Sequence, residues 1–249
     1  MPLIRDSAIV LKRLEFSESS QVLVVLTRDH GKVRVIAKGI RRSTRRRFSP
    51  GIDLLETGEI VLSVRRPGQE ALAIISEWKQ RQAFSGLREG LDRLHAAQYA
   101  GDIVVGLTEE WDPHPAVYDA LEGSLGALAS GQRVFAVLVA LQQALLTETG
   151  VGPRLDRCVG CGQAVVDGDI YFSSFEGGLL CRDCEPARVE KRLVTISHQG
   201  LVAGSFATDA DLCGAFDLFN YHISHVMGRP PAAHQHLLRL AAALRPQGR

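Results

Sequence analysis

The sequence predicts a multidomain α+β protein: an N-terminal five-stranded β-barrel, an α-helical domain, and a small four-cysteine module inserted among the helices. Three observations support this prediction. Short segments rich in Val, Ile and Leu fill residues 1–80, apolar residues then recur at steps of three and four, and paired cysteines with many glycines interrupt that pattern. The predicted boundaries are 1–80 for the barrel, 81–154 and 190–249 for the two parts of the helical domain, and 155–189 for the inserted module.

Five strands are predicted in the first 80 residues, because each segment is short, rich in β-branched residues and bounded by turn residues. Asp29-His30-Gly31 predicts a hairpin turn between the second and third strands, since Gly31 can adopt a positive φ. Five short strands with tight turns indicate a small closed barrel of the OB or SH3-like kind. The predicted strands are residues 8–14, 21–27, 32–39, 60–65 and 71–75.

The helices are predicted from apolar residues spaced three and four apart, a pattern that starts after Trp78 with Phe84. Pro113 and Pro115 separate the first helix from the second, and the segment 150–153 (Gly-Val-Gly-Pro) ends the third. The apolar stripes cover residues 84–107, 117–128, 134–145, 212–226 and 237–244.

The net charge of +1 conceals an asymmetry between the two ends of the chain. Residues 1–80 carry a net charge of +6, and residues 81–249 carry −5. A basic head on an acidic body indicates a polyanionic partner for the head. The chain has no apolar run of the roughly 20 residues that a membrane span needs, and no apolar signal-peptide core. We therefore expect a soluble, cytoplasmic protein without a membrane partner.

Four of the five cysteines form two C-x2-C pairs, separated by 19 residues. Each pair presents two thiolates to one metal ion, and two such pairs complete a tetrahedral S4 site. Four thiolates leave no open coordination position, so we expect one structural Zn²⁺, with iron as the other metal that such ligands suit. Two disulfides are the alternative, which a cytoplasmic location disfavours, and four unrelated thiols are another. The predicted ligands are Cys158, Cys161, Cys181 and Cys184.

Cations occupy alternate positions of the third predicted strand, so they share the face opposite its apolar residues. The strand leads into a segment with five arginines in seven residues, followed by an aromatic residue. Arginine binds phosphate through its bidentate fork, and an aromatic ring can stack on a single-strand base. The predicted DNA-binding residues are Lys32, Arg34, Lys38, Arg41, Arg42, Arg45, Arg46, Arg47 and Phe48.

Other interpretations of this basic segment stay open. It is alternatively a solvated loop or an arm that docks an acidic protein, and Phe48 is equally well explained as a core anchor. The competing classes of protein are a zinc-ribbon factor associated with RNA binding or transcription, and an adaptor that binds acidic partners through this loop. An RNA-binding protein would prefer RNA to DNA, and an adaptor would bind neither.

The sequence does not support catalysis. It contains no P-loop, dinucleotide-binding, zinc-protease or serine-hydrolase motif. The acidic pairs at 167 and 169 and at 209 and 211 stand in turn or helix-start contexts, where Asp is favoured for local reasons. His222 and His225 are interpreted as residues of the polar face of a helix. We therefore expect a binding protein that is not an enzyme and has no catalytic residues.

With these residues in view, the chain resembles the bacterial RecO family of DNA repair proteins. The similarity extends in order along most of the sequence and includes the basic hairpin loop, a Pro-containing helical segment, and the approach to and exit from the cysteine module. The segments that carry it are Thr27–Gly31, Val35–Ser43, Tyr99, Glu109–Leu121, Leu138, Gly150–Gly162 and Phe175–Cys184.

The resemblance implies an N-terminal OB-fold, a helical domain and a zinc-binding module. It also implies a non-enzymatic recombination mediator of the RecFOR pathway, located in the cytoplasm with the nucleoid. Such proteins bind single- and double-stranded DNA, anneal complementary strands, and with RecR help RecA to replace the single-stranded-DNA-binding protein, whose acidic C-terminal tail contacts the helical domain. By matching positions, Lys38, Arg41 and Arg42 would contact DNA, whereas the assignment of residues 45–47 depends on charge alone.

Overall fold

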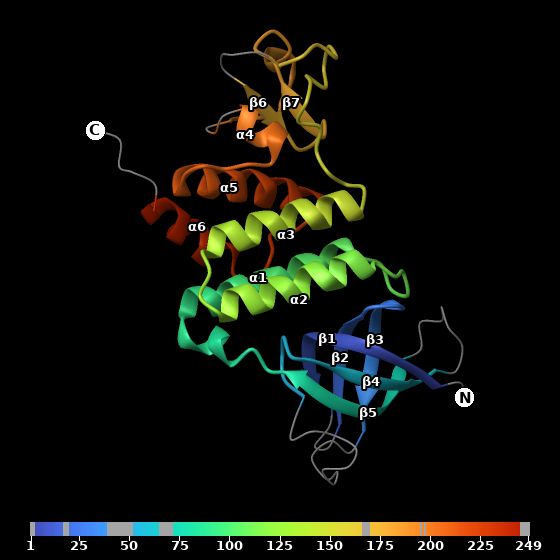
Figure 1. The fold of residues 1–249 in the computed structure, drawn as a ribbon. Helices are drawn as coiled ribbons and strands as arrows, with labels where there is room; N and C mark the ends of the chain where they lie inside the picture. The colour runs from blue at the N-terminus through green and yellow to red at the C-terminus, as the bar shows by residue number, and fades with distance from the viewer. Residues whose placement is uncertain are drawn as a thin grey trace. The chain divides into compact units, whose positions relative to one another are not determined.

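The computed structural model describes residues 3–16, 20–38, 52–64, 72–165, 170–194, 196 and 198–244. These residues form a mixed α+β structure, in which a five-stranded barrel is followed by helices and a small three-stranded sheet (Figure 1). The chain divides into two compact units, Met1–Gly131 and Gln132–Arg249. The first unit contains the barrel and two helices, and the second contains the other helices and the cysteine module.

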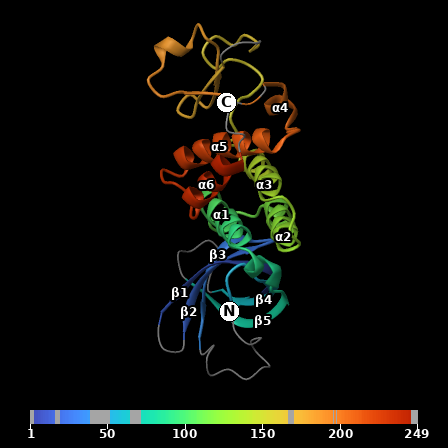
Figure 2. The same ribbon diagram turned by 90° about the vertical axis from the view of Figure 1, so that its left-hand side faces the viewer.

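The five predicted N-terminal strands are confirmed, and they close into a barrel with the order β1-β2-β3-β5-β4 (Figures 1 and 2). β1 pairs with β4 to complete the ring, and β3 runs parallel to β5 through the pairs Val35–Ala73 and Ile36–Ile74. Every other pair in the barrel is antiparallel. The strands are β1 (Leu3–Glu15), β2 (Gln21–Thr27), β3 (Gly31–Ala37), β4 (Thr57–Ser63) and β5 (Ala73–Gln82).

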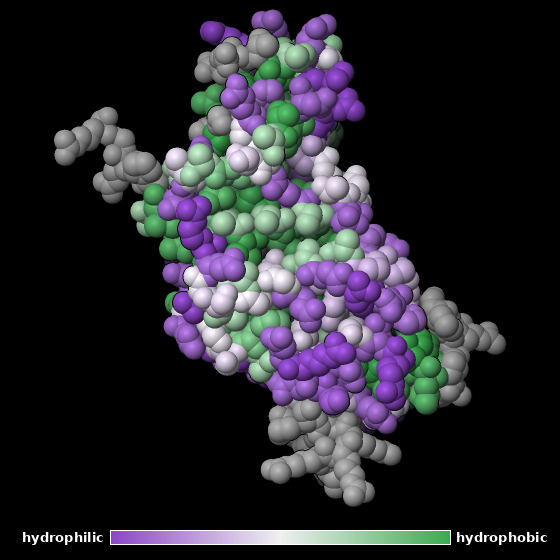
Figure 3. Space-filling view, in the orientation of Figure 1, coloured by the Kyte–Doolittle hydropathy of each residue, from purple (hydrophilic) through white to green (hydrophobic). Residues whose placement is uncertain are grey.

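The interior of the barrel is filled by the inward residues of all five strands, because alternate side chains of a strand point to opposite faces. On the outside, hydrophilic residues predominate over the barrel on the face that Figure 3 shows, with an apolar patch at one edge. The core consists of Ala8, Val10, Leu23, Val25, Val33, Val35, Ala37, Ile52, Ile60, Leu62, Val64, Ala73, Ile75 and Trp78.

A β-bulge in β1 changes which of its residues face outward. The register with β2 shifts between Val10 and Lys12, so that Lys12 pairs with Val24 and Leu14 pairs with Val22. The backbone stays hydrogen-bonded at the bulge, because the Val10 N–H donates to the Glu56 carbonyl at 3.0 Å. Before the bulge the even-numbered residues of β1 point inward, and after it they point outward.

The transition from strand to helix lies later than the sequence predicted. β5 continues through Trp78, whose side chain is 2% exposed and belongs to the barrel core. The helix predicted from Phe84 is wrong at its start: Ser85–Glu89 is a 3-10 helix, and Gly90 is extended before the first α-helix. A 3-10 helix repeats every three residues, so the spacing of Phe84 and Leu87 suits it as well as an α-helix.

The remaining predicted helices are confirmed, and the short α4 was not predicted. α5 begins at a capping box, in which the Asp211 N–H donates to Thr208 Oγ1 at 3.1 Å and the Thr208 N–H donates to the Asp211 carboxylate. Phe135 and Phe216 join α3 to α5, with ring centroids 5.1 Å apart. The helices are α1 (Leu91–Leu107), α2 (Pro115–Ala129), α3 (Val134–Glu148), α4 (His198–Ala203), α5 (Asp209–Val226) and α6 (His234–Leu244).

Within the described ranges, no helix has the length and apolar character needed to cross a membrane.

The turn between β2 and β3 contacts the loop between α1 and α2. Gly31 ends the turn at φ +74°, and a Cβ at this position would lie 2.1 Å from the Asp112 carbonyl oxygen. The Trp111 N–H donates to the Lys32 carbonyl at 2.9 Å, and the Trp111 side chain packs against the barrel core. Only glycine meets both demands at position 31, since it has no Cβ and tolerates a positive φ.

We predict that Gly31→Ala lowers the free energy of unfolding of the N-terminal unit by more than about 2 kcal/mol, because backbone strain adds to a backbone clash. Both tryptophans, Trp78 and Trp111, belong to this unit, so their fluorescence in a urea titration reports on it alone. Gly131→Ala is the matched control: its φ is +81°, but its Cβ would meet the flexible Arg93 side chain. Equal losses of unfolding free energy in the two variants would contradict the predicted clash with the Asp112 backbone.

Candidate metal centre and nucleic-acid interface

The cysteine module is a small antiparallel sheet that joins two turns. Its strands are β6 (Tyr171–Ser173), β7 (Gly178–Leu180) and β8 (Arg192–Leu193), in the order β7-β6-β8. One C-x2-C turn precedes β6 in the chain, and the other directly follows β7 and leads into the 3-10 helix Glu185–Ala187. The sheet therefore brings together two turns that lie far apart in the sequence.

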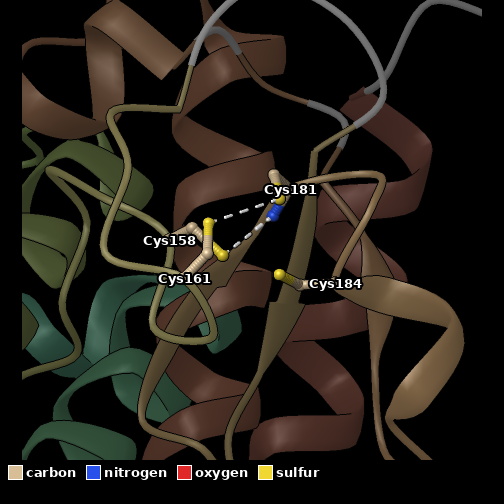
Figure 4. Close-up of side chains that lie close together, drawn as sticks. All are labelled: Cys158, Cys161, Cys181 and Cys184. Carbon is tan, nitrogen blue, oxygen red and sulfur yellow. Dashed lines mark hydrogen bonds between the residues drawn. The ribbon is translucent and has the colours of Figure 1, made fainter.

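The four cysteine side chains converge on one point from these two turns (Figure 4). Their sulfur atoms all lie within 4.8 Å of one another, and the Sγ atoms of Cys161 and Cys181 are 3.9 Å apart. A tetrahedral site with metal–sulfur bonds of about 2.3 Å requires sulfur atoms about 3.8 Å apart. All four thiols are free of disulfides. The four residues could therefore hold a metal ion, in the arrangement that their spacing predicted.

Local backbone hydrogen bonds shape each turn. In the first turn, the Cys158 N–H donates to the Gln163 carbonyl and the Gly162 N–H donates to the Cys158 carbonyl, both at 2.9 Å. In the second, the Cys184 N–H donates to the Cys181 carbonyl at 3.1 Å. Gly160 lets the turns approach, because a Cβ there would lie 3.0 Å from the Cys184 Cβ.

The electrostatics of the four thiols favour a cation between them. Burial raises the pKa of the Cys158 thiol, but backbone N–H groups, including those of Cys181 and Gly160 at 3.4 and 3.3 Å from its sulfur, outweigh it and lower that pKa to about 6. The neighbouring cysteines, Cys181 first, raise the pKa of Cys184. A metal cation neutralises the repulsion between thiolates this close, and binding it displaces their protons.

A half-buried carboxylate connects the module to α5. Glu190 accepts hydrogen bonds from Ser173 Oγ at 2.6 Å, from the Phe175 N–H at 3.0 Å, and from the Tyr221 hydroxyl. Burial opposes the charged form, but these donors outweigh it and lower the pKa of Glu190. No motif in the sequence marked this residue, because its partners come from two other segments, Ser173–Phe175 and α5.

His222 makes a second connection and corrects one sequence interpretation. It was expected on the polar face of its helix, but the residue is 4% exposed. Its Nδ1 lies 2.9 Å from Ser174 Oγ and its Nε2 lies 2.8 Å from the Val151 carbonyl. Because a carbonyl only accepts, Nε2 carries the proton and Nδ1 accepts from the serine. Burial lowers the pKa of His222, which is the main reason that it stays neutral near pH 7.

Lys32, the first predicted DNA-binding residue, lies at the carboxyl end of α1. Its ammonium group donates to the Val105 carbonyl at 2.6 Å and to the Thr108 carbonyl. These are carbonyl groups of the kind that the end of a helix leaves without a helical partner. Burial lowers the pKa of Lys32. The Lys32 side chain therefore faces the helix, although the alternation of side chains along the strand predicts that it points to solvent or to a polyanion.

The next cations on the outer face are paired as well. Arg34 is exposed, and its Nε lies 2.6 Å from a carboxylate oxygen of Glu110. Lys12 on β1 lies 3.3 Å from the largely buried carboxylate of Asp102. Lys38 is also exposed, and within the described ranges no ion pair joins it to another residue. The predicted third strand ends one residue before Lys38, which is more accessible to a ligand than Lys32 or Arg34.

The other predicted contacts, Arg41, Arg42, Arg45, Arg46, Arg47 and Phe48, lie outside the described residues, as do Asp167 and Asp169. Asp209 and Asp211, the other acidic pair, begin α5, where Asp211 takes part in the capping box. Their position agrees with the local role that the sequence indicated.

The barrel and the cysteine module fall within regions that two protein-family models describe. The model "Recombination protein O N terminal" matches residues 1–84, and "Recombination protein O C terminal" matches residues 88–217. The chain therefore belongs to the RecO family of recombination proteins, and the resemblance noted in the sequence is confirmed. Membership of this family implies a role in DNA repair through recombination.

Individual relatives are similar over most of their length. The DNA repair protein RecO of Anaeromyxobacter dehalogenans (strain 2CP-C) is 32% identical over 95% of this chain and 96% of its own. Its namesake from Rhodopirellula baltica is 33% identical over 79% of this chain and 72% of its own. That of Rubrobacter xylanophilus is 35% identical over 74% of this chain and 72% of its own.

We predict that the protein purified without chelator contains one equivalent of a thiolate-binding metal per chain. Cys161→Ser removes one ligand from an exposed position, so it should lower the metal content several-fold, as elemental analysis by mass spectrometry measures. Cys213→Ala is the control, because Cys213 is a buried cysteine outside the cluster. A wild-type protein without bound metal would refute the site.

We predict that the C-terminal unit loses stability as the pH falls below about 6.5, the ordinary pKa of histidine. The pKa of His222 is lower in the folded state, so its contribution is complete above the unfolded value and is lost as the pH falls through the folded one. The measurement is urea unfolding followed by circular dichroism. The transition of the C-terminal unit is the one that tryptophan fluorescence does not detect, because both tryptophans belong to the N-terminal unit.

His222→Gln removes the titrating group and should flatten this pH dependence. The exposed His225→Gln removes only a neighbouring charge that helps to lower the pKa of His222, so it should flatten the dependence less. Protonation of the cysteine thiolates affects both variants alike, so their difference isolates His222. An identical pH profile in His222→Gln and wild type would argue against the prediction.

Proposed function

We propose that this protein is a non-enzymatic recombination mediator that binds single- and double-stranded DNA and anneals complementary strands. With RecR, it promotes the loading of RecA onto DNA coated by the single-stranded-DNA-binding protein, in the cytoplasm at the nucleoid. The observation that supports this most is membership of the RecO family along the chain, from the barrel through the cysteine module. The relatives' name, DNA repair protein RecO, is consistent with it.

We propose an OB-fold for the barrel. The supporting observations are five strands in the order β1-β2-β3-β5-β4, with β3 parallel to β5 and every other pair antiparallel. OB-folds are partly open Greek-key barrels that bind oligonucleotides. On this barrel, Lys38 is an exposed cation directly after β3, and the arginines at 41, 42 and 45–47 follow it in the sequence. We assign phosphate contacts to these six residues and retain Phe48 as a candidate for base stacking.

We propose that the four cysteines hold one Zn²⁺ in a zinc-ribbon-like module. The ligands are all thiolates and leave no coordination position for substrate, so the metal would stabilise the fold and take no part in chemistry. Annealing requires only that two polyanions be brought together, which a cationic surface achieves by neutralising charge. The absence of a P-loop motif from the sequence fits this mechanism, which uses no ATP.

We predict that the protein accelerates the annealing of complementary oligonucleotides coated with bacterial single-stranded-DNA-binding protein, without ATP. Replacing Arg41, Arg42, Arg45, Arg46 and Arg47 together by alanine should slow annealing and weaken binding of single-stranded DNA. The slope of log affinity against log salt concentration should become less negative by about 3.5 if five phosphate contacts are lost. Fluorescence anisotropy over a series of salt concentrations measures this slope.

Replacing the same five arginines by lysine is the matched control, because it keeps the charge and should keep most of the slope. An unchanged slope in the alanine variant would remove the loop from the DNA site. A clear preference for RNA over DNA of the same sequence would favour an RNA-binding factor. Binding to neither would favour the adaptor.

A further inference from the structure

An apolar ledge covers the outer face of the barrel at the end where β1 leads to β2 and β3 ends. Leu14 and Phe16 lie there, with exposed fractions of 59% and 66%. Leu14 pairs with Val22, which in turn pairs with Ile36, and the Phe16 N–H donates to the Ser20 carbonyl at 3.2 Å. We define the apolar ledge as the exposed Leu14 and Phe16 together with their neighbours Val22, which is half-buried, and Ile36, which is buried.

The bulge in β1 creates this ledge. Without the register shift between Val10 and Lys12, the alternation of β1 would turn Leu14 toward the barrel interior. With it, Leu14 shares the outer face with Lys12. Isolated exposed leucines are common on protein surfaces, but neighbouring exposed apolar residues on one face indicate an interaction site.

Charge divides this outer face into two regions. Toward α1, Lys12, Lys32 and Arg34 are engaged by Asp102, by helix carbonyls and by Glu110. Beyond them lies the apolar ledge, and the adjacent end of β3 leads to the exposed Lys38. In the sequence, the five arginines come within nine residues after Lys38. Of these cations, Lys38 lies on the side of the ledge away from α1, and no described ion pair engages it.

We propose that the apolar ledge binds the bases of extended single-stranded DNA, with Phe16 as a stacking residue, while phosphates contact Lys38. This inference rests on the proposed function and adds a base-contacting element to it. Bases of a single strand offer apolar faces that stack on aromatic rings regardless of sequence, and the backbone follows neighbouring cations. In a duplex the same faces are already stacked, so the ledge favours single strands.

The test is Phe16→Ala in the full-length protein, with binding to a labelled oligothymidine and to a duplex of equal length measured by anisotropy. Single-strand affinity should fall about tenfold, and duplex affinity should change less than about twofold. The salt slope should stay that of the wild type, because no charge is removed. Leu3→Ala is the matched control: Leu3 is 68% exposed on the same strand, at its other end, and should bind as the wild type does.

Phe16→Trp provides a direct signal of the contact. A tryptophan at this exposed position should keep single-strand affinity and lose fluorescence when oligothymidine binds, through stacking. The Phe16→Ala variant retains only Trp78 and Trp111, so its fluorescence measures the background signal. This background should not change when DNA binds. Because Phe16 is largely exposed, melting temperatures should stay close to that of the wild type, which separates loss of contact from loss of fold.

Four outcomes would overturn the inference. Unchanged single-strand affinity in Phe16→Ala would remove the ledge from the site and leave the proposed function standing. Equal losses for single strand and duplex would exclude a contact with unstacked bases. Loss of a wild-type oligomer in light scattering, with DNA affinity intact, would assign the ledge to contact between copies of this chain. A wild-type protein that binds no DNA would overturn the proposed function as well.

Discussion

The parallel pairing of β3 with β5 is the constraint on which the N-terminal unit depends. It involves the pairs Val35–Ala73 and Ile36–Ile74, yet it turns an open sheet into a closed ring. Closure removes the free strand edges and gives every strand one inner and one outer face. The inner face becomes the apolar core, and the outer face becomes a continuous surface around the ring. Both the contact with α1 and the apolar ledge are regions of that surface.

The outer face shows why positive charge in a strand does not equal charge available to DNA. Lys32 and Arg34 share the outer face of β3, and Lys38 follows the end of that strand. Lys32 donates to helix carbonyls and Arg34 pairs with Glu110, so the free energy needed to break these contacts opposes their use by phosphate. Lys38 is exposed, and no described ion pair engages it. The bulge in β1 exposes apolar residues at this same end.

The cysteine module needs another source of stability, because its roughly 30 residues have little apolar core of their own. Four sulfurs lie close enough to share a metal ion, which would hold its two turns together. The carboxylate of Glu190 and the neutral ring of His222 connect its sheet to neighbouring segments of the C-terminal unit. Polar groups removed from solvent need their partners to be present, so these contacts favour one arrangement of the module. The sulfur cluster and the polar contacts thus lie in different parts of the same small structure.

Features that depend on local spacing could be predicted from the amino-acid sequence. Alternating apolar residues predicted five strands, stripes at three and four residues predicted the helices, and two C-x2-C pairs predicted the sulfur cluster. The tertiary structure alone decided where Trp78 lies, that Lys32 faces a helix end, that Glu190 joins three segments, and that Leu14 and Phe16 face outward. These features depend on contacts between residues distant in sequence, or on a one-residue bulge that reverses the faces of a strand. Local periodicity contains no information about either.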